Sequence, residues 1–252
     1  MPENLVSARF SKAADSYDKA AFLQKNMAGS LVKLIDNTIF YEDILEIGCG
    51  TGYLSNLLIE KLRIKHLYIN DISAPMLQKC QARLQHEDKV LCTFINEDAR
   101  LLKLEQPCDA IISNAVFQWF DDLKSALNQI KANLKEGGSL YFSTFLSDTC
   151  IELKHLGFAG IDYLDKDGLS RVLQDCGFEI ERFIDNSQSS FFKDPKELLL
   201  YFKATGVNSL SQAPWTKGQL QTFIKNYTAC YKTSLGVRLT WCPCFIKAIF
   251  KG

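Results

Sequence analysis

Hydrophobic and polar positions follow two different periods along the first two thirds of the chain. Short apolar stretches predict strands over Ile44–Ile47, His66–Asn70, Leu91–Ile95, Ala110–Ser113 and Ser139–Phe145. Helical periodicity between them predicts helices over Tyr53–Lys61, Pro75–Leu84 and Asp122–Leu134, the last ended by Gly137 and Gly138. This alternation predicts right-handed βαβ units and a parallel sheet, whose ligands bind beyond the carboxyl ends of the strands.

The pattern changes after Phe145. The sequence predicts a helix, an extended segment and a final strand at Asp167–Asp175, Phe178–Asp185 and Val237–Phe250. Two more helices are predicted to begin at Asp194 and Thr216, which are capping residues that precede helical periodicity. Residues 193–236 therefore read as a helical insertion between the last two strands. The first 30 residues read as one amphipathic helix.

The composition is that of an ordinary globular protein. The chain has 252 residues, of which 47% are apolar and 23% are charged. Its first residues, MPENLVSARF, lack the basic start and apolar core of a secretory signal. No stretch approaches the roughly 20 uninterrupted apolar residues that are needed to span a bilayer. We expect a cytoplasmic protein.

The nine cysteines are scattered along the chain and form no C-x-x-C pair. An odd count with this spacing argues against a disulfide framework and against a zinc site, so we expect no metal. The closest pair, Cys242 and Cys244, falls inside the predicted final strand. Residues two apart in a strand share a face, which favours buried, reduced thiols.

The charge distribution is uneven, although the formal net charge is zero. From Asn186 to Gly252 there are nine Lys or Arg residues and two acids, so this segment carries an excess of seven positive charges. The preceding residues carry the balancing negative excess. The asymmetry indicates either a basic face that meets an acidic partner or a solvated surface without a special role.

The segment ILEIGCGTGYL, residues 44–54, combines an acid with a glycine-rich turn. The spacing is E-x-G-x-G-x-G, at Glu46, Gly48, Gly50 and Gly52. A dinucleotide fingerprint requires G-x-G-x-x-G, and Tyr53 occupies the place of its third glycine. The spacing resembles the first motif of class I S-adenosylmethionine-dependent methyltransferases. This cofactor has no phosphate, so the loop needs only to let its backbone approach the ligand, and Glu46 is expected to compensate positive charge or to orient the loop.

Three more strand ends carry polar residues where the same cofactor would need them. Asp71 ends the second strand and is placed to accept both ribose hydroxyls. Asp98 ends the third strand and is placed to bind the adenine amino group, with help from the Ala99 backbone. Asn114 ends the fourth strand at the mouth of the pocket. The expected cofactor contacts also include Cys49, Ile72 and Met76.

The segment after the fourth strand, SNAVFQWF, contains amides and aromatic groups but no general base. Methyl transfer from a sulfonium is an in-line displacement in which the enzyme aligns the reacting atoms and excludes water. A base is needed only where the acceptor must lose a proton. The site therefore suits a carboxylate, which is already ionised at neutral pH, or an acceptor that brings its own base. No residue is assigned as catalytic.

The chain resembles one family over nearly its whole length. The segments are RFSKAADSYDKAAFLQ, LEIGCGTG, NDIS-x-x-ML-x-x-C, SNAVFQW, ELLLYFKATGVN and LTW-x-x-x-FIKA. They resemble the malonyl-[acyl-carrier protein] O-methyltransferases, which open pimelate synthesis for biotin. The resemblance implies a Rossmann-like, mostly parallel seven-stranded sheet. It also implies methylation of the free carboxylate of a malonyl thioester, carried on an acidic acyl-carrier protein, without a nucleic acid or membrane partner.

The same resemblance implies roles for particular residues. Tyr17 is expected to close over the cofactor, and Gln118 and Trp119 are expected to line the acceptor pocket. Arg9 or Lys12 is expected to pair with the malonyl carboxylate. The basic C-terminal third then acquires a carrier-docking role, with candidates at Lys193, Lys196, Lys203 and Lys225.

The expected organisation is one methyltransferase domain over residues 1–252. It comprises an N-terminal helical cap over 1–40, a cofactor-binding core over 41–185, the insertion over 193–236 and the last strand over 237–252. Pro243 departs from a regular strand, because proline removes a ladder donor and favours an edge or a bulge.

Three alternatives remain at the level of sequence. The first is a small-molecule carboxyl methyltransferase resembling the trans-aconitate type, which shares an N-A-x-x-Q-W-like segment. The second is a nucleic-acid methyltransferase, against which Arg238 is the only arginine of the basic segment. The third is a non-catalytic cofactor-binding protein, which the intact glycine loop with Asp71 and Asp98 disfavours.

Overall fold

The fold is built on a seven-stranded sheet, in a computed structural model that describes residues 3–158, 160–205 and 215–252. The strand order is β3-β2-β1-β4-β5-β10-β6. Strands β1 to β5 are mutually parallel, and β10 runs antiparallel to both of its neighbours. The strands are β1 Phe40–Ile47, β2 Arg63–Asn70, β3 Leu91–Ile95, β4 Cys108–Asn114, β5 Leu134–Phe145, β6 Phe178–Asp185 and β10 Pro243–Phe250. The expected mostly parallel, Rossmann-like sheet is confirmed.

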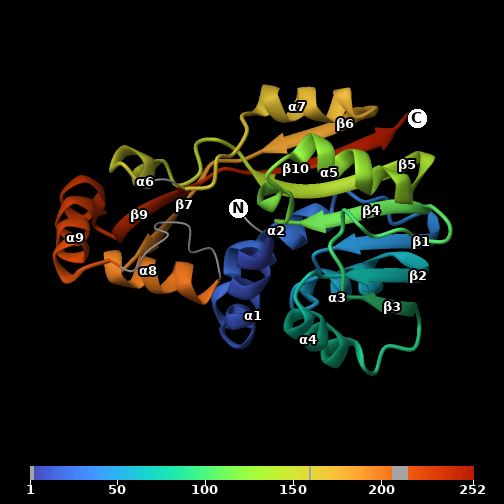
Figure 1. The fold of residues 1–252 in the computed structure, drawn as a ribbon, viewed down its shortest axis with the longest axis horizontal. Coiled ribbons are helices and arrows are strands. Elements are labelled where there is room, and N and C mark those ends of the chain that lie inside the picture. Colours follow the sequence, from blue (N-terminus) through green and yellow to red (C-terminus); the bar gives the residue numbers. More distant parts are fainter. Residues whose placement is uncertain (1–2, 159, 206–214) are drawn as a thin grey trace.

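Helices cover both faces of this sheet (Figure 1). The α-helices are α1 Glu3–Ala20, α2 Phe22–Val32, α3 Tyr53–Lys61, α4 Ala74–Leu84, α5 Leu123–Ile130, α6 Ile151–His155, α7 Lys166–Asp175, α8 Pro195–Ala204 and α9 Lys217–Tyr231. Two short 3-10 helices are η1 Phe117–Trp119 and η2 Lys131–Asn133. None of the helices in the described part of the chain is both long and apolar enough to cross a membrane.

The alternation of side chains along the buried strands divides the core into two apolar clusters. In β1, Ile44 packs in the cluster under α2 and α3, whereas Leu45 packs in the cluster under α5 and α7. In β5, Tyr141 and Phe142 divide between the same two clusters. Both faces of the sheet are therefore apolar and covered by helices, as in other parallel sheets. Polar residues of the sheet can meet a ligand at the ends of its strands.

A second, three-stranded sheet extends the molecule beyond the main one, and the sequence did not predict it. Its order is β7-β9-β8, with β7 Gln188–Phe192, β8 Lys232–Thr233 and β9 Gly236–Trp241. An antiparallel ribbon joins the sheets, since β6 continues into β7 while β9 continues into β10. Figure 1 shows this ribbon running from the main sheet toward α8 and α9.

The predicted single strand Val237–Phe250 is therefore wrong, because the chain changes sheets at Cys242. The Cys242 N–H donates to the Thr149 hydroxyl at 3.1 Å instead of to a strand. Pro243, which has no N–H, then begins β10, a central strand rather than an edge. Cys242 and Cys244 do not share one strand, but all nine cysteines are free thiols.

Three other boundaries differ from the sequence prediction. The first 30 residues form two helices separated at Ala21, not one. Helix α5 ends at Ile130, and Leu134 already begins β5, so the paired glycines lie inside a strand rather than ending a helix. The insertion over 193–236 contains α8 and α9 as predicted, together with β8 and the start of β9. Residues 206–214 of the insertion, which include the whole G-V-N segment, lie outside the described residues.

Candidate functional site

The glycine loop after β1 is bent by three residues in the left-handed region of backbone conformation. Gly48, Gly50 and Gly52 have φ values of +71°, +54° and +81°. A Cβ atom on Gly48 would lie 2.3 Å from a methyl of Val116, so this position also requires a close approach. Gly48 is therefore required for two reasons: the positive φ of the backbone and the lack of space for a Cβ atom beside Val116.

Four backbone N–H groups of this loop are already used within the protein. Gly48 and Cys49 donate to the Asn70 carbonyl at 2.8 and 3.0 Å, and Gly52 donates to the Cys49 carbonyl at 2.9 Å. The Gly50 N–H donates to a carboxylate oxygen of Asp71 at 2.8 Å. A phosphate-binding loop presents such groups to its ligand instead. The geometry therefore disfavours a dinucleotide.

Asp71 lies at the end of β2 and faces the cavity in front of this loop. Its second carboxylate oxygen accepts from the Ser73 N–H at 2.8 Å, so the two oxygens tie the loop to the start of α4. Burial raises the pKa of Asp71 to about 6, and the two backbone donors act in the opposite direction. Each oxygen keeps a free lone pair when ionised, which leaves room for a diol.

Asp98 follows β3 at the other end of the same cavity, but its carboxylate is not free. Arg100 binds both of its oxygens, with contacts of 2.5 Å from Nη2 and 3.0 Å from Nε. The guanidinium also lies 5.9 Å from the centroid of the Phe120 ring. An adenine bound at Asp98 would therefore share its carboxylate with Arg100, which was not among the predicted site residues.

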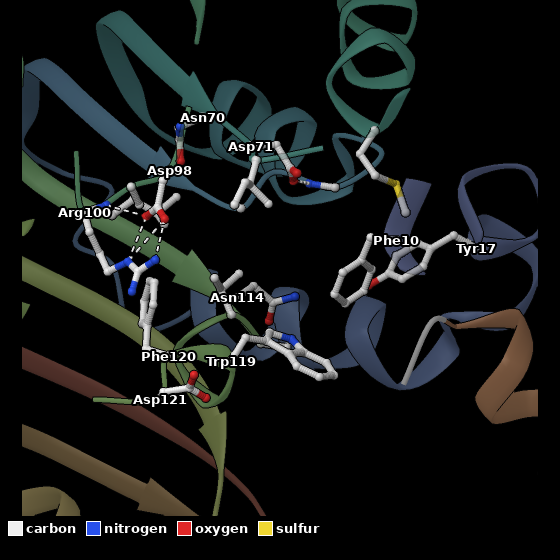
Figure 2. A pocket seen from close by; sticks show the side chains of 18 residues that line it. Phe10, Tyr17, Asn70, Asp71, Asp98, Arg100, Asn114, Trp119, Phe120 and Asp121 are labelled. Atoms are coloured by element: carbon white, nitrogen blue, oxygen red, sulfur yellow. Dashed lines mark hydrogen bonds and ion pairs between the residues drawn. The ribbon is translucent and has the colours of Figure 1, made fainter. Parts of the chain in front are cut away.

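A cavity of about 870 Å³, including its open mouth, connects these strand ends (Figure 2). The predicted site residues that line it are Tyr17, Gly48, Gly50, Asp71, Ile72, Met76, Asp98, Ala99, Asn114 and Trp119. Lining residues that the prediction missed are Phe10, Ile47, Asn70, Arg100, Ala115, Val116, Phe120 and Asp121. Asn70 and Arg100 stand one and two residues from predicted positions, so the strand-end pattern pointed near them.

Helix α1 forms the wall opposite the strand ends. Phe10 lies edge-to-face against Trp119, with ring centroids 5.3 Å apart, and Tyr17 lies beyond it (Figure 2). Asp18 anchors the helix, because it accepts hydrogen bonds at 2.6 Å from the Thr51 hydroxyl of the glycine loop and from Arg83 of α4. Phe10 and Tyr17 of this helix both line the main cavity.

Cys49 lines an adjoining cavity that contains residues of both charge signs. Asp18 and Lys25 lie on its α1–α2 side, and Tyr53 lies on the side of the glycine loop. The Lys25 ammonium lies 3.9 Å from a carboxylate oxygen of Asp18. Tyr17 lines this cavity as well as the larger one, so it stands where the two meet.

Other predicted residues lie away from the main cavity. Glu46 is fully buried behind the glycine loop, and burial raises its pKa well above the ordinary value, which favours the neutral form. It lines neither of the two cavities described above. Gly52 caps α3. Arg9 and Lys12 line none of the cavities described above, and Lys12 is exposed.

Gln118 lines a smaller, third cavity that shares a wall with the main one. Phe10, Tyr17, Ala115 and Trp119 line both cavities. The deeper wall of the third cavity comes from Phe145, Tyr163 and Trp241, whose rings contact one another at Phe145. This arrangement provides a second compartment next to the one at the strand ends.

The methyltransferase domain family matches residues 45–142, which include the glycine loop and the ends of β2, β3 and β4. A malonyl-[acyl-carrier protein] O-methyltransferase of Calditerrivibrio nitroreducens is 31% identical, and the alignment covers 93% of this chain and 91% of the relative. One from Haemophilus ducreyi is 30% identical over 100% of this chain and 98% of its own length. The chain belongs to the malonyl-[acyl-carrier protein] O-methyltransferase family.

Solved structures agree with this assignment at the level of the fold. The N-methyltransferase NodS of Bradyrhizobium japonicum, in complex with S-adenosyl-L-homocysteine, has a TM-score of 0.58 and 13% identity, and the match covers 89% of this chain and 86% of NodS. The YcgJ protein of Bacillus subtilis has a TM-score of 0.64 and 12% identity, over 90% of this chain and 99% of YcgJ.

Membership in this family makes the chain an S-adenosylmethionine-dependent methyltransferase, as the glycine motif predicted. The main cavity suits that cofactor. Its lining carries three acids, Asp71, Asp98 and Asp121, and one cation, Arg100. A negative lining attracts a sulfonium and repels the phosphates of a dinucleotide. In the described residues, no group of three or more His, Cys, Asp or Glu could hold a metal ion.

Proposed function

We propose that the chain methylates the free carboxylate of a malonyl thioester carried on an acyl-carrier protein, and so opens pimeloyl assembly for biotin synthesis. The observation that carries this proposal is the similarity to malonyl-[acyl-carrier protein] O-methyltransferases over nearly the whole chain. That similarity extends beyond residues 45–142 to the N-terminal helices and to Tyr163 and Trp241, which line the second compartment. The proposal also includes one domain over residues 1–252 and a cytoplasmic location.

S-adenosylmethionine, when bound, supplies a methyl group on a positively charged sulfur. In our proposal Asp71 accepts the ribose hydroxyls, and Asp98 and the Ala99 backbone hold the adenine. Tyr17 closes over the cofactor from α1. These assignments rest on where the side chains lie in the main cavity.

The acceptor side supports a carboxylate substrate because it offers no general base. The third cavity is lined by aromatic, amide and alanine side chains, with Gln118 and Trp119 among them. A carboxylate needs no deprotonation at neutral pH, so positioning and exclusion of water suffice. The methyl ester that forms has lost its charge, which lets enzymes of fatty-acid synthesis bury it as an apolar unit.

The carrier would dock on the exposed face of α8. Lys196, Leu200 and Lys203 lie four and three residues apart, so they form one stripe, and Lys193 precedes the helix. Leu200 is 64% exposed between the two lysines. Lys225 is exposed on α9. A basic stripe with an apolar centre suits an acidic carrier protein better than nucleic acid, for which arginine is preferred.

The direct test is transfer of labelled methyl from S-adenosylmethionine to a malonyl-loaded carrier protein. We expect base-labile label on the malonyl thioester and none on the acetyl-loaded carrier, which lacks the carboxylate. A free dicarboxylate and an RNA serve as competing acceptors. Label on the free acid in place of the thioester would support the trans-aconitate-like alternative, and label on the RNA would replace our proposal with a nucleic-acid methyltransferase.

A further inference from the structure

The third cavity is the compartment from which an acceptor would reach the cofactor. It shares Phe10, Tyr17, Ala115 and Trp119 with the cofactor cavity, so the two cavities adjoin along these side chains. Its remaining wall comes from α2, η1, β5, the segment before α7 and the end of β9. A group held in this cavity faces the place where Tyr17 closes on the cofactor.

The described residues that line this cavity are all neutral. Its polar groups are the hydroxyls of Tyr17 and Tyr163, the amides of Gln24 and Gln118, and the indole N–H groups of Trp119 and Trp241. The Trp241 N–H already donates to the Ser190 hydroxyl. Burial raises the pKa of both tyrosines, so they remain hydrogen-bond donors at neutral pH. The lining therefore provides donors without providing a cation.

The two amides, Gln118 and Gln24, differ in how many hydrogen bonds they already make within the protein. The Gln118 amide donates to the Ala115 carbonyl at 2.7 Å and accepts from the Thr144 hydroxyl at 3.1 Å, so its orientation is fixed. Gln24 is 9% exposed, and its side-chain oxygen position has no hydrogen-bond partner among the described residues. The Tyr201 hydroxyl, which is also buried and without a partner, neighbours this amide. Leaving two buried polar groups unsatisfied is costly, and together they have hydrogen-bonding capacity left for a ligand atom. Turning the amide by half a rotation presents N–H donors to the same point.

A neutral site has a chemical advantage for methylation of a carboxylate. The attacking oxygen loses negative charge as the reaction proceeds, so a paired cation would stabilise the ground state more than the transition state. Neutral donors can fix one carboxylate oxygen while the other remains free to attack. The positive charge of the sulfonium provides the counter-charge across the shared wall.

We propose, building on the function proposed above, that Tyr163 and Gln24 orient the acceptor carboxylate by neutral hydrogen bonds, and that no lysine or arginine pairs with it. The free carboxylate oxygen forms the new O–CH₃ bond with its own lone pair. The electron pair of the S–CH₃ bond leaves with the sulfur, and no proton is transferred. This replaces the pairing with Arg9 or Lys12 that the sequence suggested.

The test compares two small ligands on enzyme saturated with S-adenosylhomocysteine. The ligands are the malonyl and acetyl thioesters of N-acetylcysteamine, which differ by the carboxylate, and calorimetry measures the dissociation constant of each. Tyr163→Phe and Gln24→Leu should each weaken malonyl binding about tenfold, the usual loss for one hydrogen bond to a charged group. Neither should change acetyl binding. Tyr231→Phe, which removes a hydroxyl that contacts His155 outside the cavity, is the matched control and should change neither ligand.

The outcomes separate this inference from the proposed function. If wild-type enzyme methylates no malonyl thioester, the proposed function fails and this inference with it. If wild-type enzyme does so, but Tyr163→Phe and Gln24→Leu bind both ligands as wild type does, only the inference fails. An equal loss for both ligands would show a packing role and would also overturn it. Arg9→Gln and Lys12→Gln should bind the malonyl ligand within twofold of wild type, and a loss above tenfold in either would restore the ion pair.

Discussion

The two compartments of the site are built in different ways. In the cofactor compartment, Asp71, Asp98 and Asn114 each stand at or just after the end of a parallel strand, so one sheet edge places all three. In the acceptor compartment, the side chains come from segments as distant as α1 and β9, brought together by tertiary packing. The sheet alone places the residues of the first compartment, whereas the second compartment depends on how helices, loops and the second sheet pack around the first sheet.

The difference extends to electrostatics. The cofactor compartment is lined by three acids and one arginine, whereas the acceptor compartment is lined only by neutral side chains among the described residues. Under the proposed function, the acidic lining suits a cationic cofactor, and the neutral lining leaves the anionic acceptor to pair with the sulfonium.

The largest effect is expected for Asp71→Ala. This carboxylate ties Gly50 to Ser73 and is proposed to bind two ribose hydroxyls, so its loss removes several charge-assisted hydrogen bonds at once. We expect affinity for S-adenosylhomocysteine to fall at least about 100-fold, measured by calorimetry. Asp109→Ala is the matched control, because Asp109 also accepts two backbone N–H groups, from Glu42 and Asp43 at the opposite end of the sheet. It should reduce stability and leave the affinity unchanged.

Gly48→Ala should destabilise the cofactor loop by about 2 kcal/mol more than Gly137→Ala. Both glycines have similar φ values, +71° and +76°, so the backbone strain of the two variants is comparable. Only at Gly48 would the new methyl group meet another atom, a methyl of Val116 at 2.3 Å, whereas Gly137 has open space. Urea denaturation measures both variants. Adding Val116→Ala to Gly48→Ala should recover most of the difference, and no recovery would refute the contact as its cause.

The pH dependence of cofactor binding should follow Asp71. Its pKa of about 6 in the free protein means that acidification removes the ionised form that accepts the hydroxyls. Affinity for S-adenosylhomocysteine should therefore be about tenfold weaker at pH 5 than at pH 7.

The stability of the free protein should change in the opposite direction with pH, because the raised pKa of Asp71 favours the folded state in acid. A raised folded pKa contributes stability that is complete below about 3.8 and is lost as the pH rises through about 6. In Asp71→Asn both trends should disappear, and a persistent trend would point to another group.

The sequence predicted which strand-end residues meet at one cavity, because those residues lie at fixed places relative to the strands. Asp71 and Asp98 could be read from the point where an apolar stretch ends. Arg100 could not, because its pairing with Asp98 depends on a turn that brings the guanidinium back over the carboxylate. Glu46 belongs to the same motif, but its burial behind the loop depends on the packing of α3 and α4, which periodicity does not show.

The acceptor compartment was harder to predict for a physical reason. The stretch Val237–Phe250 is mostly apolar and β-branched, and this composition alone does not show that a strand leaves one sheet and enters another. Pro243 was the visible signal of that break. Tyr163 lies in a segment without periodicity before α7, so only the tertiary structure brings it to Phe145 and Trp241.

The smallest effect on activity is expected when the three lysines Lys193, Lys196 and Lys203, at and before the exposed face of α8, are replaced by Glu. Exposed charges steer association more than they hold a complex, so kcat/KM for the malonyl-loaded carrier should fall about five- to tenfold, more at low salt than at high salt. The malonyl thioester of N-acetylcysteamine should be turned over at the wild-type rate, because it needs no docking surface.

The matched control for that variant reverses three exposed lysines on the other side of the fold, Lys33, Lys61 and Lys89, with the same change in net charge. If docking is local to α8, this control keeps its activity on the carrier. If both variants lose activity equally, the carrier responds to net charge alone, and the stripe on α8 has no special role. If the α8 variant loses activity on both substrates, α8 is needed for the acceptor compartment itself and not only for docking of the carrier. The acceptor site would then depend on the basic surface of α8 as well as on its neutral lining.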